Sequence, residues 1–313
     1  MTDRLQRLLA RAQARTGRFW TRQRWWNEGM AAAADQPMVV RRARAFQHLL
    51  ANVEIRIQSD EILVGWHPSS QPPAAPRAAA TPPPRRDPQD DYRLPAERAA
   101  LKAGVFTSAN KPDHLTANYP RLLTEGADAL LDRIETATHD HPPEQAVQRE
   151  AMRSAVESFA AYIERHADVA LRLASEAEDP RRQDDLSTIA AVCRHVAHKP
   201  PRTLREALQL AWFAFLVSCM ENGPSTGAFA VGRFDQYLWP FWQADAERGI
   251  SREVLVEQVG CFWVKLNEFV MHGLATGVLN MTIGGGLPDG SDGVNDLSWS
   301  SPDLKLTPSG SHY

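Results

Sequence analysis

Two short segments hold residues that could act on a substrate, one around a histidine and the other around two opposite charges. Asp113 precedes His114, and a histidine whose pKa lies near neutrality can hold or shuttle a proton on a substrate hydroxyl. Arg233 and Asp235 follow Gly232 and precede several aromatic residues. Because buried charges are costly unless they pair, we expect either a structural salt bridge in an aromatic core or a place at the edge of an internal cavity. His114, Arg233 and Asp235 are the candidate substrate-binding residues.

A second group, Cys193, His195 and His198, has the residue types that bind zinc. Successive residues of a helix are rotated by about 100°, so His195 and His198 share a face from which Cys193 points away. The spacing therefore predicts no metal site here.

The glycine-rich stretch 284–293 could cradle a phosphate or a cation through Gly284 to Gly286 or through Asp289 and Asp292. A phosphate-binding loop would continue with Lys-Ser or Lys-Thr, and a calcium loop would close with a glutamate. Neither feature follows in the sequence. The stretch predicts a tight turn after a strand.

Helices must position most of these residues. Periodic apolar patterns predict helices within 1–50 and over 119–136, 146–178, 182–198, from 203 to 219, and from 251 onward. Thr203 and Glu206 form a capping-box pattern, in which both side chains satisfy free amides at a helix start. Short strands are expected at 229–231 and 279–283, and residues 53–57 predict either a half-buried strand or an extended segment between turns.

The stretch 67–95 is rich in proline, which continues neither a helix nor a sheet, so it predicts an extended connector. It would separate the N-terminal helices and short extended segment of residues 1–66 from a helical domain with a few barrel strands, residues 96–299. Residues 300–313 are polar and nonperiodic and predict an aberrant or disordered tail.

Composition narrows the class of protein. The 313 residues, 43% of them hydrophobic, suffice for a core, and a net charge of −3 gives no basic field for nucleic acid. The longest apolar run, 210–220, is shorter than the roughly 20 residues of a membrane span. An odd number of cysteines without a signal peptide favours a reduced, cytoplasmic setting. The Arg-rich N-terminus could be a transit peptide, but an amphipathic first helix with Leu5, Leu8 and Leu9 on one face is the favoured interpretation.

Taken together, several segments resemble the N-terminal part of the glycyl radical enzymes, the family of pyruvate formate-lyase and glycerol dehydratase. The resemblance extends from about residue 30 to residue 299 in the family's order. The segments that carry it are 41–46, 60–65, 113–126, 200–209, 221–222, 232–236, 265–268, 280–285 and 292–298.

The resemblance implies a mainly α fold with α/β character, in which an N-terminal helical shell surrounds a partial half-barrel. The complete family barrel is ten-stranded and consists of two antiparallel five-stranded half-sheets. In the family, a glycyl radical near the C-terminus oxidises a cysteine on a central loop to a thiyl radical, which abstracts hydrogen from the substrate. A separate iron–sulfur enzyme that uses S-adenosylmethionine installs the glycyl radical, so no directly bound cofactor is expected. Full-length relatives imply a homodimer.

The two loops that carry this chemistry, Gly-Cys-x-Glu-like and Arg-Val-x-Gly-Tyr-like, do not occur in the sequence. Cys193 and Cys261 match positions on structural helices of the family, so neither inherits the thiyl role and no catalytic residue is assigned. Asp113 replaces the usual glycine, and Ala230 stands where many relatives have a pocket serine. The substrate is therefore left open.

Three functions are compatible with this sequence. The first is an N-terminal fragment of a radical enzyme for C–C, C–O or C–N bond cleavage, inactive alone. The second is one half of a split enzyme whose partner chain carries the missing loops. The third is a non-catalytic assembly or binding module that keeps the dimer-forming helices. A C-terminal half or an activating enzyme is the expected partner, and neither nucleic acid nor membrane is.

Overall fold

The computed structural model describes residues 1–14, 21–66, 95–103, 115–137, 145–222, 229–271 and 281–300. The predicted connector, apart from its last residue, and the predicted tail after residue 300 lie outside these ranges, and the proposed domain boundaries stay predictions. The helices are α1 (Asp3–Ala14), α2 (Thr21–Ala32), α3 (Met38–Asn52), α4 (Pro95–Lys102), α5 (Tyr119–Thr136), α6 (Ala146–Glu176), α7 (Pro180–Val196), α8 (Leu204–Asn222), α9 (Phe234–Glu247), α10 (Arg252–Met271) and α11 (Asp296–Ser300).

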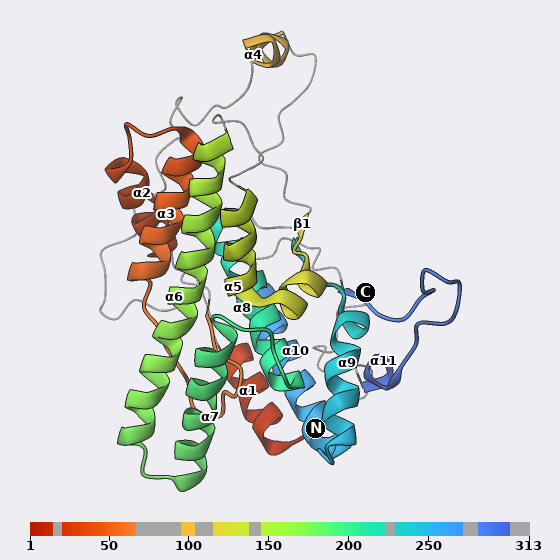
Figure 1. Ribbon diagram of the computed structural model, residues 1–313. Helices are drawn as coiled ribbons and strands as arrows, with labels where there is room; N and C mark the ends of the chain where they lie inside the picture. The colour runs from red at the N-terminus through yellow and green to blue at the C-terminus, as the bar shows by residue number, and fades with distance from the viewer. Residues whose placement is uncertain are drawn as a thin grey trace.

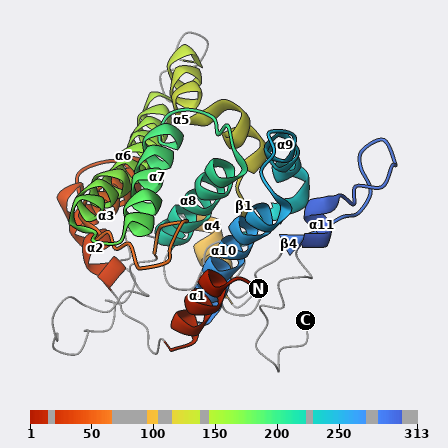
Figure 2. The same cartoon turned by 90° about the horizontal axis from the view of Figure 1, so that it is seen from below.

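The apolar helix α8 lies at the centre of the molecule, with α5, α7, α9 and α10 around it (Figure 2). A helix that is apolar on all sides must be buried on all sides, and most of α8 is. Its start confirms half of the predicted capping box: the Thr203 hydroxyl accepts a hydrogen bond from the Glu206 amide at 3.2 Å. The Glu206 carboxylate instead accepts from the Arg202 amide at 2.6 Å, and Asp245 caps Leu204 from α9 at 2.8 Å.

The helices α2, α3, α6 and α7 form a layer on one side of α8, and α9 and α11 lie on the other side (Figure 1). The long α6 and α7 run antiparallel, and Asp179 caps α7 by accepting a hydrogen bond from the Arg181 amide at 3.0 Å. The N-terminal helix α1 packs against α10. Leu5 and Leu8 are buried there and Leu9 is half-buried, so the amphipathic first helix is confirmed.

In the part of the chain that the structure describes, four short strands form two separate parallel pairs. Strand β1 (Leu115–Thr116) pairs with β2 (Phe229–Ala230), and β3 (Gly232–Arg233) pairs with β4 (Met281–Thr282). The strands predicted at 229–231 and 279–283 are thus confirmed at 229–230 and 281–282, whereas residues 231 and 283 lie outside the strands.

Residues 53–57 form no strand, and the extended alternative is the observed one. Further along the same segment, side chains of α8 take the place of a neighbouring strand. The Gln209 amide group both accepts from the Val64 N–H and donates to the Val64 carbonyl, each at 2.8 Å. The Trp212 indole N–H donates to the carbonyl of Gly65 at 3.0 Å.

A buried ion pair joins this extended segment to α10. The ammonium group of Lys265 bonds the carboxylate of Glu61, which also accepts from the Trp66 indole N–H at 2.6 Å. The same ammonium lies 4.3 Å from the centre of the Trp66 ring. Two of the segments that carry the family resemblance, 60–65 and 265–268, therefore meet in the core. In the described part of the chain, no helix is long and apolar enough to cross a membrane.

Candidate functional site

The predicted site residues Arg233 and Asp235 lie where β3 ends and α9 begins. Gly232 has a φ of 66°, in the left-handed region that favours glycine. A Cβ added there would lie 3.0 Å from the Thr116 side chain of β1. Asp235 falls in the first turn of α9 and is 1% exposed. His114 lies outside the described residues, and the residue after it, Leu115, opens β1.

Arg233 reaches the glycine-rich segment after β4 rather than a carboxylate. Its Nη2 donates to the carbonyl of Gly284 at 3.2 Å and to that of Gly286 at 3.0 Å. The guanidinium therefore fixes two backbone carbonyls of residues 284–298, which we call the glycine turn.

Asp235 bonds the same turn from the other side. Its Oδ2 accepts the Gly284 amide at 2.6 Å and the Ser298 hydroxyl, and its Oδ1 accepts the side-chain amide of Gln236 at 3.1 Å. Hydrogen bonds donated to an ionised carboxylate are stronger than neutral ones, and they satisfy this buried charge. Arg233 and Asp235 thus each bond the glycine turn and hold it against α9, an arrangement that neither of the two predicted alternatives described.

Three further residues complete this arrangement, although sequence reasoning gave them no role of their own. Gln236 Nε2 donates to the carbonyl of Gly293 at 2.6 Å, and the Asn295 side chain donates to the carbonyl of Asp235 at 3.2 Å. The Gly293 amide in turn donates to Gly285 at 2.8 Å. The signal that could have found them is their position in segments 232–236 and 292–298, which carry the family resemblance.

The glycine turn is closed so tightly that Gly293 has no room for a side chain. A Cβ added there would lie 2.6 Å from the carbonyl oxygen of Gly285. Gly284 and Gly285 have φ values of 66° and 84°. The predicted tight turn after a strand is therefore present, and its Gly284 and Gly293 amides bond protein groups.

An aromatic pair supports the neighbouring β1–β2 pair. The rings of Tyr119 and Tyr237 stack with their centres 5.2 Å apart. The Tyr237 hydroxyl donates to the carbonyl of Val231 at 2.9 Å, and that of Tyr119 donates to Ala230 at 3.4 Å. Burial raises the pKa of both phenols above the usual value. They stay neutral and fix the backbone of β2, where Ala230 stands in register with Thr116.

Apolar side chains remain exposed around the two strand pairs. Leu115 of β1 is 50% exposed, and Trp299 of α11 is 64% exposed. Ile283, which precedes the glycine turn, and Val294 within it are 39% and 40% exposed. Each sheet has only two strands in the described part of the chain. This end of the molecule therefore presents apolar surface and strand edges together.

The three cysteines are buried on helices α7, α8 and α10. Burial raises the pKa of the Cys193 and Cys261 thiols to about 12, so both are protonated at neutral pH. The two histidines near Cys193 bond different groups: His195 contacts the carbonyl of Pro200 at 2.9 Å, and His198 contacts carboxylates on other helices. Among the described residues, no group of three or more His, Cys, Asp or Glu could hold a metal.

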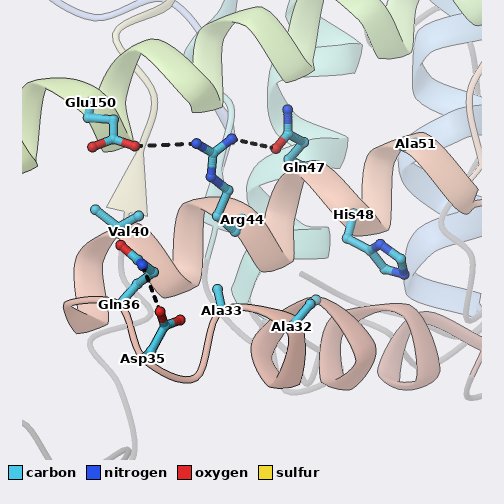
Figure 3. Close-up of a pocket in the computed structure, with 11 residues that line it drawn as sticks. Ala32, Ala33, Asp35, Gln36, Val40, Arg44, Gln47, His48, Ala51 and Glu150 are labelled. Atoms are coloured by element: carbon cyan, nitrogen blue, oxygen red, sulfur yellow. Dashed lines mark hydrogen bonds and ion pairs between the residues drawn. The ribbon is translucent and has the colours of Figure 1, made fainter.

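A groove lies between α2 and α3, away from the predicted site residues (Figure 3). Arg44 crosses it and bonds Glu150 at 3.3 Å and Gln47 at 3.0 Å, and His48 contacts Glu28 at 3.3 Å. The positive charge of Arg44 at the centre of the groove is thus already paired with the carboxylate of Glu150. The groove lies on the opposite side of α8 from α9 (Figure 1), so it is separate from the predicted site.

Comparisons with known proteins agree over most of the chain. The pyruvate formate lyase-like family matches residues 87–301. A probable dehydratase of Escherichia coli is 29% identical over 329 residues, which cover 85% of this chain and 40% of that protein. An isethionate sulfite-lyase of Nitratidesulfovibrio vulgaris is 32% identical over 200 residues, 58% of this chain and 24% of that protein.

Solved structures show the same fold. A glycyl radical enzyme from Archaeoglobus fulgidus superposes with a TM-score of 0.78 at 26% identity, over 96% of this chain and 46% of that one. Hydroxyproline dehydratase from Clostridioides difficile, at 24% identity, superposes with a TM-score of 0.79 and supports the fold alone. The expected mainly helical fold with a few barrel strands is confirmed. The chain spans less than half the length of these relatives.

Proposed function

The chain belongs to the pyruvate formate lyase-like family, the glycyl radical enzymes, and on this premise we propose that it forms the helical shell and part of the barrel of an enzyme that cleaves a small substrate by radical chemistry. The relatives carry the names of dehydratases and sulfite-lyases, which favours a lyase reaction on a small hydroxylated compound. The enzyme would work in the cytoplasm.

We propose further that the thiyl cysteine and the radical glycine come from polypeptide outside these 313 residues, so that the chain is inactive alone. The cysteines that it does contain are buried on helices, and the two thiols with raised pKa values lack thiolate character. A separate S-adenosylmethionine iron–sulfur enzyme would install the radical, with no cofactor bound directly to this chain.

The observation that carries this proposal is the exposed end of the molecule around the strand pairs. Unpaired strand edges and apolar surface are costly in water and are normally covered. Leu115, Ile283, Val294 and Trp299 are exposed there. Further barrel strands, which would also bring the cysteine and glycine loops, would cover them, whether they belong to the same polypeptide or to a partner chain.

Within that barrel, we assign the predicted site residues different tasks. His114 would contact a substrate hydroxyl, since it directly precedes β1. Arg233 and Asp235 would act as positioning residues, because their side chains are committed to the glycine turn. The glycine turn that Arg233 and Asp235 hold in place would border the substrate.

Reconstitution tests this function. The chain is expressed alone and together with the polypeptide from the same genome that carries Gly-Cys-x-Glu-like and Arg-Val-x-Gly-Tyr-like loops, each time with the activating enzyme. Electron paramagnetic resonance should detect a glycyl radical only in the combined sample, and only that sample should cleave hydroxylated substrates. His114→Ala should lower turnover without loss of the radical signal.

If the genome encodes no such polypeptide, or if the combined sample shows neither complex nor radical, the enzymatic proposal fails. A stable, folded oligomer of the chain alone would then favour the assembly module.

A further inference from the structure

His198 stands where three helices meet, in the segment between α7 and α8. Its Nδ1 lies 2.9 Å from Oδ1 of Asp128 on α5, and its Nε2 lies 3.0 Å from Oε1 of Glu164 on α6. Both ring nitrogens therefore face a carboxylate, and the two carboxylates belong to different helices. The side chain of His198 is 41% exposed, so solvent protons reach it.

The segment between α7 and α8 also packs against a kink in α5. Gly126 has φ 76° and ψ 176°, which interrupts the helix. A Cβ added to Gly126 would lie 2.7 Å from the backbone nitrogen of Pro200. After the kink, the Asp128 amide donates to the carbonyl of His198 at 3.0 Å. His198 thus holds the second half of α5 through its backbone as well as its side chain.

The number of protons on the imidazole decides how many helices it can bond. A neutral imidazole has one N–H, so it can donate to only one of the two carboxylates, whereas an imidazolium donates to both. We propose that His198 is a proton-dependent fastener, which joins α5 to α6 when it is protonated and lets go of one of them when it is neutral.

The charges around His198 make this release feasible. On the α5 side, Lys199 lies 2.8 Å from Asp128, and Asp132 acts on Lys199 from the same helix. Towards α6 and α7, Arg194 lies 4.0 Å from Glu164 and bonds Asp168. Each carboxylate that His198 bridges therefore keeps a cation after the bridge opens, and neither is left as an isolated charge.

The direction of the pH effect follows from these neighbours. Glu164 first, and then Asp128, raise the pKa of His198 above its usual value. A raised pKa in the folded state means that the bridge contributes fully below about pH 6.5 and is lost as the pH rises through the raised value. His166 has the opposite pH dependence. Complete burial lowers its pKa to about 3, so the folded state loses stability through His166 only as the pH falls below about 6.5.

The test is an NMR titration of the whole chain labelled with carbon-13 at histidine. The resonance that disappears in His198→Gln should titrate with a midpoint above about 6.5. Glu164→Gln should move this midpoint downward. The control is His48→Gln, which removes a histidine that faces the single carboxylate of Glu28 and should leave the His198 midpoint unchanged.

A midpoint at or below 6.5, or one that Glu164→Gln does not move, would overturn the proposal. Thermal unfolding gives a second readout: between pH 6 and pH 9 the midpoint of the unmodified chain should fall by about 1–3 °C more than that of His198→Gln. An equal decrease of the unfolding midpoint in both proteins would also contradict the proposal. If His198→Gln does not fold, the resonance that Glu164→Gln shifts identifies His198, and the absence of any such shift counts against the proposal.

Discussion

The carboxylate of Asp235 is buried, and its part in holding the glycine turn depends on the groups that donate hydrogen bonds to it. Its carboxylate receives the Gly284 amide, the Ser298 hydroxyl and the Gln236 side chain, while Arg233 bonds carbonyls of the same turn. The sequence predicted the two charges as site residues, but not these partners. The Gly284 amide lies 49 residues from Asp235 along the chain, and a local pattern holds no information on such a contact.

Asp235→Asn should lower the free energy of unfolding by about 1–3 kcal/mol, because an amide group would place N–H donors against an existing donor in a buried position. Urea unfolding measures the change. Asp289→Asn is the matched control, since the exposed Asp289 accepts from the amide and hydroxyl of the nearby Ser291 and the change should alter stability by less than about 0.5 kcal/mol. Similar losses in both variants would show that the Asp235 hydrogen bonds do not hold the turn.

Gly293→Ala should destabilise the chain by about 1–3 kcal/mol or more, because the new methyl group would clash with the carbonyl oxygen of Gly285 at 2.6 Å. Gly286→Ala lies in the same turn, and its Cβ would have 4.0 Å to the nearest atom, so we expect a change below about 0.5 kcal/mol. Thermal unfolding compares the two. If Gly286→Ala proves as harmful as Gly293→Ala, the closure described for the turn is wrong.

At the scale of elements, helices were the easier part to predict. Their apolar periodicity and their caps are local, so the predicted helix at 119–136 is α5 and the one that opens at Thr203 is α8. The segment around residues 53–66 was harder. The alternation of residues 53–57 fits a strand, but no strand forms there. Further along, the backbone of Val64 is bonded by the side chain of Gln209, 145 residues away. The kink of α5 was also missed, because it depends on the approach of Pro200 to Gly126.

Gln209→Leu should therefore cost more than a typical core substitution of similar volume. It would leave the Val64 N–H and carbonyl without their partner, at about 1–3 kcal/mol for each buried group. Urea unfolding should show a loss of roughly 2–6 kcal/mol, against less than about 0.5 kcal/mol for Gln183→Leu on the exposed face of α7. A loss below 1 kcal/mol for Gln209→Leu would mean that the extended segment finds other partners.

For the molecule as a whole, two ends differ in character. The helical layers around α8 bury a continuous apolar core, whereas the end that carries β1, β4 and α11 exposes Leu115, Ile283 and Trp299. Family resemblance predicted the helical shell and the few barrel strands. It gave the identity of the fold, but not the substrate, because the proposed thiyl and glycyl loops lie outside this sequence.

Hydrogen–deuterium exchange tests the proposed barrel completion most directly. Exchange is followed in the chain alone and after addition of the polypeptide that carries the cysteine and glycine loops. Amides of β1 and β4 (115–116 and 281–282) should become at least about tenfold slower to exchange, as they gain strand partners, while those of α8 stay unchanged. Equal exchange of β1 and β4 with and without that polypeptide would contradict the view that this chain is part of a shared glycyl radical enzyme barrel.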